Sequence, residues 1–208
     1  MLGLLRALRI WRAVLTLLLL LWWDGQSWTY RGGVTAERRA RRQQQRARWL
    51  TAELLSLGSA FIKLGQLLSA RPDILPAGWV AELAALQDSG PAFSFDQVQT
   101  VLERELGPRC AEVIDLDPEP LGAASLAQVH RASLRSGRQV VLKVQRPGLD
   151  RLFRLDLEVM QQVAAVLQRN PSWGRGRDWP AMARECRRVL LRELDFRVGR
   201  LLRGDEDQ

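Results

Sequence analysis

Two neighbouring segments of this 208-residue chain carry the signal of a β-hairpin, and helical segments lie on both sides of them. Residues 127–134 and 139–145 flank the short turn Arg135-Ser136-Gly137, an arrangement that predicts two paired strands. We expect helices over residues 35–56, 59–70, 77–87, 95–106, 150–169 and 180–202, a linker over 25–33 and a loop over 170–177. Helices, then a small sheet, then more helices is an order typical of an α+β fold.

Length and composition limit the kinds of site that the chain can hold. A chain of 208 residues with 47% hydrophobic residues suits one ordinary domain, or a small domain with appendages. Cys110 and Cys186 form no CxxC motif, and reduced thiols facing the cytosol are the plain interpretation. The single histidine, His130, excludes a histidine-based triad and a multi-histidine metal site. We therefore predict no metal site in this chain.

The net charge of +8 is confined to the first quarter of the chain. Residues 1–50 contain ten arginines and two acidic residues, whereas residues 51–208 contain 21 basic and 21 acidic residues. A nucleic-acid-binding protein would carry basic residues interleaved with aromatic ones on its folded body. The distribution therefore argues against nucleic acid as a partner and favours a membrane surface.

The N-terminal region combines this charge with an apolar run. Residues 13–23 are apolar except for one threonine, and as a helix they would span roughly 16 Å, about half of the ~30 Å hydrocarbon core. Arg6, Arg9 and Arg12 would share one polar arc of that helix, with leucines on the other side. The run is therefore too short to cross a bilayer by itself.

Three interpretations of this region remain open. A cleaved signal peptide has the right charged start, but no A-x-A site follows the run. A buried core helix is the second, and an interfacial or partly inserted anchor is the third. We favour the anchor, because Trp22 and Trp23 suit an interfacial belt and the arginines that follow suit anionic lipid headgroups. This predicts a membrane-associated protein on the cytoplasmic face, with membrane lipids as partners.

Only two of the 31 basic residues are lysines, Lys63 and Lys143. Lysine and arginine are nearly interchangeable on a solvated surface, but not where a compact ammonium must contact a phosphate or a buried carboxylate. The two lysines therefore mark candidate functional positions. The alternative is that both are surface lysines that were never replaced.

A candidate nucleotide-binding loop leads into the hairpin. On the kinase pattern G-x-G-x-x-G-x-V the chain matches Gly122 and Val129, with alanine in place of the other two glycines. Lys143 follows Val129 by fourteen residues on the next strand, where such a fold places its phosphate-pairing lysine. Because alanine has a Cβ, the backbone of such a loop cannot approach phosphates as closely as glycine allows. The predicted nucleotide-binding residues are Gly122, Ala123, Ala124, Ser125, Val129 and Lys143.

The other lysine lies in the helix predicted over residues 59–70. Lys63 and Gln66 share one face of it, and Gly65 between them would let another backbone come close. Glu193 lies on the apolar stripe of the last predicted helix, where a partly buried carboxylate needs a cation. We expect Glu193 to be the partner of Lys143, with Lys63 competing for it. The alternative cation is Arg197, four residues later on the same helix.

Together these motifs resemble the AarF/UbiB family of atypical protein-kinase-like proteins over roughly residues 50–197. The resemblance is carried by the KxGQ helix (Lys63, Gly65, Gln66), the alanine-rich loop, the strand lysine Lys143 and the segment Glu193-Leu194-Asp195-Phe196, which is similar to the family's helix C. It implies a kinase-like N-lobe that binds ATP with Mg²⁺, in a kinase or ATPase of quinone or lipid metabolism. It also implies quinone precursors or quinone-biosynthesis proteins as partners. In the family the KxGQ helix covers the nucleotide pocket, so the resemblance implies a regulatory role for this helix.

The end of the chain departs from the family pattern. Gly199 stands where the family has a second glutamate, and the sequence shows neither a catalytic-loop aspartate nor a DFG motif. We therefore expect an N-lobe without a C-lobe, and no catalytic residue in this chain. The predicted parts are a membrane-associating segment (1–34), a helical extension with the KxGQ motif (35–110), the N-lobe (111–197) and a divergent tail (198–208). Two functions remain open: an atypical kinase or ATPase, and a non-catalytic membrane-associated fragment or regulator.

Overall fold

The computed structural model describes residues 2–30, 32–73, 75–86 and 92–194. Its elements, in chain order, are α1 (Leu2–Asp24), η1 (Ser27–Thr29), α2 (Ala36–Leu57), α3 (Ser59–Ser69), α4 (Ala77–Ala84), α5 (Phe95–Leu106), η2 (Gly107–Glu112), β1 (Val113–Ile114), β2 (Gly122–Ala123), β3 (Ala127–Leu134), β4 (Gln139–Gln145), α6 (Leu149–Arg169), α7 (Pro171–Gly174) and α8 (Trp179–Leu194). Most of these residues are helical, and the one sheet is small and antiparallel. The predicted α+β class is confirmed.

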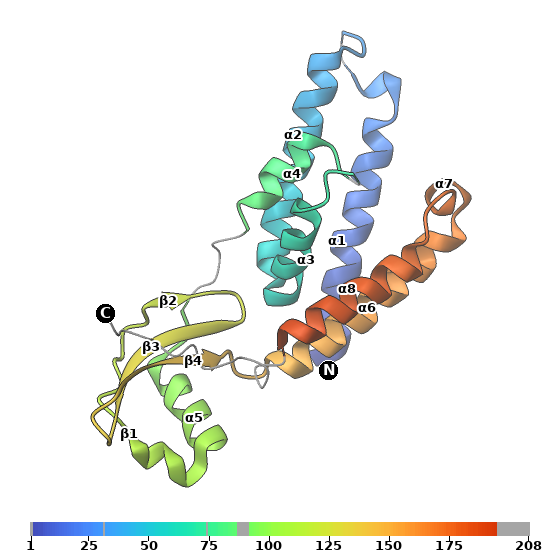
Figure 1. The fold of residues 1–208 in the computed structure, drawn as a ribbon. Helices are drawn as coiled ribbons and strands as arrows, with labels where there is room; N and C mark the ends of the chain where they lie inside the picture. Colours follow the sequence, from blue (N-terminus) through green and yellow to red (C-terminus); the bar gives the residue numbers. More distant parts are fainter. Residues whose placement is uncertain (1, 31, 74, 87–91, 195–208) are drawn as a thin grey trace.

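The helices before and after the sheet share one apolar core. Helix α1 contacts α2 and α6, helix α3 contacts α2, α4, α6 and α8, and α6 pairs with α8 along its length (Figure 1). Buried side chains from all of these helices meet, among them Ile10, Phe61, Leu83, Phe153 and Leu190. The helical extension and the last two long helices are therefore one packed unit.

The sheet forms a second, smaller unit with α5. Strand β3 pairs with β4 along one edge and with the two short strands β1 and β2 along the other. Helix α5 packs against one face, where Val98 and Val101 meet Val144 of β4 in a separate apolar cluster. Figure 1 shows this unit beside the helical one, with β2 and the loop after it nearest to α3.

Several predicted elements have the expected bounds, and others differ. Strands β3 and β4 have the predicted bounds, and α5 begins after a Ser94 capping box as expected. Helix α4 ends at Ala84, three residues earlier than predicted. The predicted linker contains the short helix η1, and the predicted loop 170–177 contains α7, because a proline suits the first turn of a helix. Helix α8 is described to Leu194, so the rest of the helix predicted to residue 202 lies outside the described residues.

Helix α1 is neither an ordinary core helix nor a free appendage. Ile10 and Ala13 are buried against the helical unit, and the polar arc turns inward at Arg6, whose guanidinium binds both carboxylate oxygens of Asp156 at 2.7 Å. Its outward face is mostly apolar, although Arg9 and Arg12 are exposed as well. The residues exposed there, by 43–68% of their surface, are Leu4, Leu5, Leu8, Leu15, Leu19, Trp22 and Trp23. In the described part of the chain, no helix has the length and hydropathy needed to cross a bilayer.

Candidate functional site

Three of the six predicted nucleotide-binding residues lie in one row across the sheet. Gly122 on β2 pairs with Val129 on β3, and Val129 pairs in turn with Lys143 on β4. Residues directly opposite on antiparallel strands point to the same face, so Val129 and Lys143 share one face of the sheet. The other face carries the buried residues Gln128 and Val144 and is covered by α5. Lys143 is exposed, and its face of the sheet is the one that α5 leaves open.

The alanine-rich loop makes a tight turn between β2 and β3. The Ala124 N–H donates to the Ala127 carbonyl at 2.8 Å, which closes the turn. Among the described residues, Asp115 is the one non-glycine residue with a positive φ, so Ala123 and Ala124 accommodate the turn without that strain. Ser125 is buried, and its carbonyl accepts a 2.6 Å hydrogen bond from the hydroxyl of Ser59, the first residue of α3. The KxGQ helix therefore begins directly on the candidate phosphate-binding loop.

Lys63 of the KxGQ motif forms an ion pair with Glu193. Its Nζ lies 2.8 Å from Glu193 Oε2, and the two side chains are 24% and 35% exposed. The ion pair joins α3 to α8. The carboxylate on the apolar stripe of α8 therefore pairs with Lys63, the lysine expected to compete with Lys143 for it. Arg197, the alternative cation, lies outside the described residues.

Gly65 and Gln66 attach the KxGQ helix to the helices on its other side. Gln66 Nε2 donates to the Leu86 carbonyl at 2.7 Å, just after α4. A Cβ on Gly65 would lie 2.2 Å from Cδ1 of Leu86 and 3.1 Å from Cδ1 of Leu54. The sequence predicted the close approach, but the group that approaches is a pair of leucine side chains rather than a second backbone. Together with Ser59 and Lys63, these contacts fix α3 between the loop, α4 and α8.

A buried polar network behind the sheet was missed by the sequence argument. His130 donates through Nδ1 to the Asp117 carbonyl at 2.8 Å, because a carbonyl can only accept. Its Nε2 then accepts from the Gln128 amide at 3.2 Å, and the Gln128 carbonyl oxygen accepts from the Phe93 N–H. This network satisfies the groups beneath the predicted nucleotide row and gives the single histidine a structural role.

The described residues do not form a metal site. No group of three or more His, Cys, Asp or Glu side chains in the described part of the chain could hold a metal ion. What the described residues offer a nucleotide is a loop, an ammonium group and an open sheet face.

A small sheet with a tight turn and a lysine in register, joined to the helices by the hydrogen bond from Ser59 to Ser125, defines the class of a kinase-like N-lobe with a helical extension. Comparison with known proteins gives the family. The ABC1 atypical kinase-like domain matches residues 85–199, and the chain belongs to this family of atypical kinase-like proteins, as its resemblance to AarF/UbiB predicted.

The relatives are much longer than this chain. An uncharacterized protein of Synechocystis, sll1770, is 49% identical over 94% of this chain and 34% of its own length. The chloroplastic protein ACTIVITY OF BC1 COMPLEX KINASE 7 of Arabidopsis thaliana is 42% identical over 92% of this chain and 28% of its own length. A probable protein kinase UbiB of Cellvibrio japonicus is 42% identical over 67% of this chain and 26% of its own length. The chain thus spans about a quarter to a third of the curated relatives that it matches.

A solved structure also shows similarity. A chain from the complex of Rv3197 with erythromycin, from Mycobacterium tuberculosis, is 30% identical, with a TM-score of 0.46 over 77% of this chain and 41% of that chain.

Proposed function

We propose that this chain supplies the ATP-binding N-lobe of an atypical kinase or ATPase that acts in ubiquinone- or plastoquinone-type quinone metabolism, or in lipid metabolism, at a membrane. The observation that carries the proposal is the row of Gly122, Val129 and Lys143 on the open face of the sheet. Membership of the ABC1 family and the names of the relatives, UbiB and BC1 complex kinase, support the same class.

In this proposal each element has a distinct task. Lys143 would bind phosphate oxygens with its ammonium group, and Val129 would contact the base from the same face. The KxGQ helix would limit how far the alanine-rich loop can move, because Ser59 holds the Ser125 carbonyl and Lys63 is held by Glu193. Since the described residues lack a set of metal ligands, no metal-dependent step is assigned to them.

Nucleotide binding can be tested on the chain as it is. In an amide NMR titration with ATP, we expect shift changes at Gly122, Val129 and Lys143, with weak affinity, because an N-lobe forms only one wall of a kinase cleft. Lys143→Arg should weaken binding, since a guanidinium fork does not replace a compact ammonium there. Arg151→Lys, at an exposed position of α6, is the matched control and should leave binding unchanged. Shift changes confined to residues away from this row would contradict the site.

Membrane contact is proposed for the exposed apolar face of α1. A folded protein seldom exposes this many leucine and tryptophan side chains on one helix unless a membrane or a partner covers them. The excess positive charge of the chain lies in the same quarter of the sequence, which suits an anionic surface. Because Ile10 and Ala13 belong to the core, α1 would lie in the interface with its outer face towards lipid rather than insert as a separate segment.

Substitutions on the outer face test this contact without opening the core. The triple variant Leu8→Gln, Leu15→Gln and Leu19→Gln should lose most binding to vesicles that contain anionic lipid. A control variant with the same number of changes at exposed apolar positions elsewhere should retain it. The control positions, each exposed by 42–50%, are Leu55, Leu121 and Val166. Equal losses in the two triple variants would refute a specific role for α1.

The second function, a non-catalytic membrane-associated regulator, rests on the exposed leucines and tryptophans of α1 alone. The two functions differ in nucleotide binding. A regulator of this kind would bind vesicles but would show no ATP-dependent shift changes in the row of Gly122, Val129 and Lys143.

A further inference from the structure

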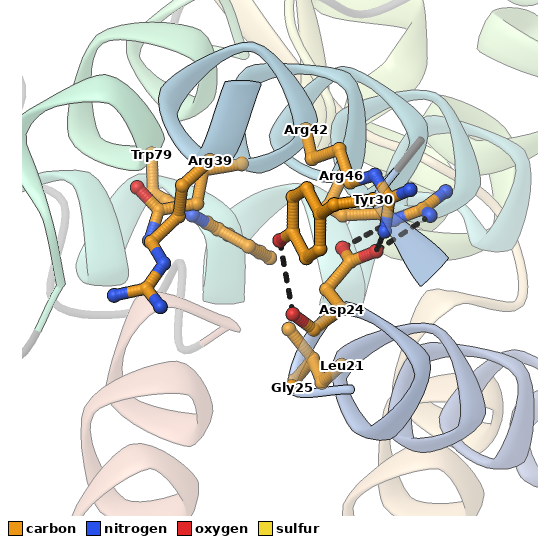
Figure 2. A pocket seen from close by; sticks show the side chains of 9 residues that line it. Leu21, Asp24, Gly25, Tyr30, Arg39, Arg42, Arg46 and Trp79 are labelled. Carbon is orange, nitrogen blue, oxygen red and sulfur yellow. Dashed lines mark hydrogen bonds and ion pairs between the residues drawn. The ribbon is translucent and has the colours of Figure 1, made fainter. Parts of the chain in front are cut away.

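A positively charged pocket lies where the end of α1 meets α2 and α4 (Figure 2). It has a volume of 280 Å³, and its walls carry Arg39, Arg42 and Arg46 of α2 with one carboxylate, that of Asp24. Three positive charges against one negative charge leave a net charge of +2. The lining residues all precede residue 85, where the match to the ABC1 domain begins, so the nucleotide site does not account for this pocket.

Two of the three arginines hold the wall of the pocket in place. Arg46 binds both oxygens of Asp24, at 2.8 and 3.0 Å, and Arg42 approaches the same carboxylate at 3.4 Å. The guanidinium of Arg42 also lies over the Tyr30 ring, 3.9 Å from its centre, and the Tyr30 hydroxyl donates to the Asp24 carbonyl at 2.9 Å. These contacts form a rigid wall in which one carboxylate is shared by two guanidinium groups, so the wall remains positive.

The third arginine is available to a ligand. Arg39 is exposed, and its side chain makes no hydrogen bond or ion pair with any residue that the structure describes. Figure 2 shows its side chain on the Trp79 side of the pocket, apart from the cluster around Asp24. Gln43, one turn further along α2, also lines the pocket. A guanidinium fork beside a neighbouring amide is suited to the paired oxygens of a phosphate group.

The position of the pocket indicates where that phosphate would come from. Leu21 and Gly25 line it, at the end of α1 where Trp22 and Trp23 are exposed, and Trp28 follows in the next turn. Exposed tryptophans of this kind are typical of the headgroup level of a membrane. We propose that the pocket binds the phosphate of an anionic phospholipid headgroup. The proposal rests on the membrane contact proposed above for the outer face of α1.

Variants that change the charge on two different faces of α2 distinguish headgroup binding in this pocket from general electrostatic attraction to the membrane. The probe is flotation of the full chain with vesicles of phosphatidylcholine and phosphatidylglycerol at about 4:1, against phosphatidylcholine alone. Arg39→Gln removes the pocket arginine, and Arg41→Gln removes an equally exposed arginine two residues away, on another side of the helix. Gln43→Glu and Gln45→Glu form a second matched pair, in which a negative charge is added inside or outside the pocket.

The pocket variants should lose more affinity than their controls. Each arginine near an anionic surface increases membrane affinity about fivefold. Arg39→Gln and Arg41→Gln should therefore both lose this factor. Arg39→Gln should lose about tenfold more, because charge-assisted hydrogen bonds to the phosphate disappear as well. Gln43→Glu should likewise weaken binding more than Gln45→Glu. Circular dichroism melts of the four variants should match the wild type, since all four positions are exposed.

Three outcomes would overturn the headgroup assignment, each in a different way. If the two variants of each pair lose equal affinity, the membrane contact of α1 is still supported, but the pocket does not bind a headgroup. Failure of the wild type to bind the anionic vesicles would refute the membrane contact and the headgroup site together. If inorganic phosphate binds in calorimetry with the same dependence on Arg39, and displaces the protein from vesicles at millimolar concentration, the ligand is a soluble phosphate rather than a lipid.

Discussion

Replacing Arg6 by methionine tests whether α1 is held to the helical unit by a buried ion pair. The carboxylate of Asp156 is fully buried, and both of its oxygens lie 2.7 Å from nitrogen atoms of Arg6. Burial raises the pKa of Asp156 above its ordinary range, while Arg6 acts in the opposite direction and favours the charged form. Without Arg6, the carboxylate must either remain charged without a partner or take up a proton.

The expected loss is large because the pair is buried. Removing one partner of a buried ion pair costs about 3–5 kcal/mol, whereas exposed pairs contribute about 0–1 kcal/mol. Arg12 and Glu53 provide the exposed comparison on the same helix, since the Arg12 side chain is 68% exposed. We therefore expect Arg6→Met to lower the free energy of unfolding by about 3–5 kcal/mol, and Arg12→Gln by less than about 1 kcal/mol.

The effect of Arg6→Met should also depend on pH. A carboxyl group whose pKa is raised on folding contributes stability below its unfolded pKa, near 4, and loses that contribution as pH rises through the folded value. Removing Arg6 raises the folded pKa of Asp156 further, so the deficit relative to the wild type should be small near pH 4 and grow towards neutral pH. The double variant Arg6→Met and Asp156→Leu removes both charges and should recover most of the loss.

Urea denaturation followed by circular dichroism, at acidic and at neutral pH, measures all of these quantities. The four variants needed are the two single changes at positions 6 and 156, their combination and Arg12→Gln. The reasoning is refuted if Arg6→Met costs no more than Arg12→Gln at neutral pH. It is also refuted if the double variant is as unstable as Arg6→Met, because the loss would then come from packing of the arginine stem rather than from the buried charge.

The remaining predictions concern the KxGQ helix and the activity of the chain. Gly65→Ala should lower the free energy of unfolding by about 1–2 kcal/mol, because overpacking against buried Leu86 outweighs the gain in helix propensity; unchanged stability would show that Leu86 moves aside easily. Lys63→Arg should disturb the α3–α8 contact more than Arg→Lys changes within residues 150–192, measured by hydrogen exchange in α3, and equal protection would contradict this. His130→Phe should lower the melting temperature by several degrees, since it leaves Gln128 without its partner; an unchanged melting temperature would rule out the structural role. The 208-residue polypeptide should show no ATP hydrolysis or protein phosphorylation above buffer, and metal-dependent turnover in a purified sample would contradict this.

Local signals were enough to predict the hairpin of β3 and β4 and the cap of α5. The hairpin follows from two strand-forming segments and a glycine turn close together in the sequence, so its register needs no distant contact. Once that register is set, Val129 must lie opposite Lys143. The ladder therefore brings together residues that the kinase pattern had singled out from spacing alone.

The same local signals could not predict contacts between elements that lie far apart in the sequence. Helical periodicity places Arg6, Arg9 and Arg12 on one arc, but not which of them meets a buried acid 150 residues away. Glu193 had several possible cations, and the choice of Lys63 depends on how α3 packs against α8. In both cases the sequence predicts that a charge needs a partner, and the tertiary packing selects which one.

Helix α1 sends one charge into the core and exposes most of its leucines, and this affects how its role can be tested. A charge of α1 enters the core at Arg6, while the leucines face outward. Deleting the N-terminal segment would therefore do two things at once, removing the proposed membrane face and leaving the Asp156 carboxylate buried without a cation. Loss of vesicle binding in such a deletion could follow from unfolding alone. Only substitutions such as Leu8→Gln, which change the outer face and leave the Arg6–Asp156 pair intact, separate a lipid-binding surface from a structural helix.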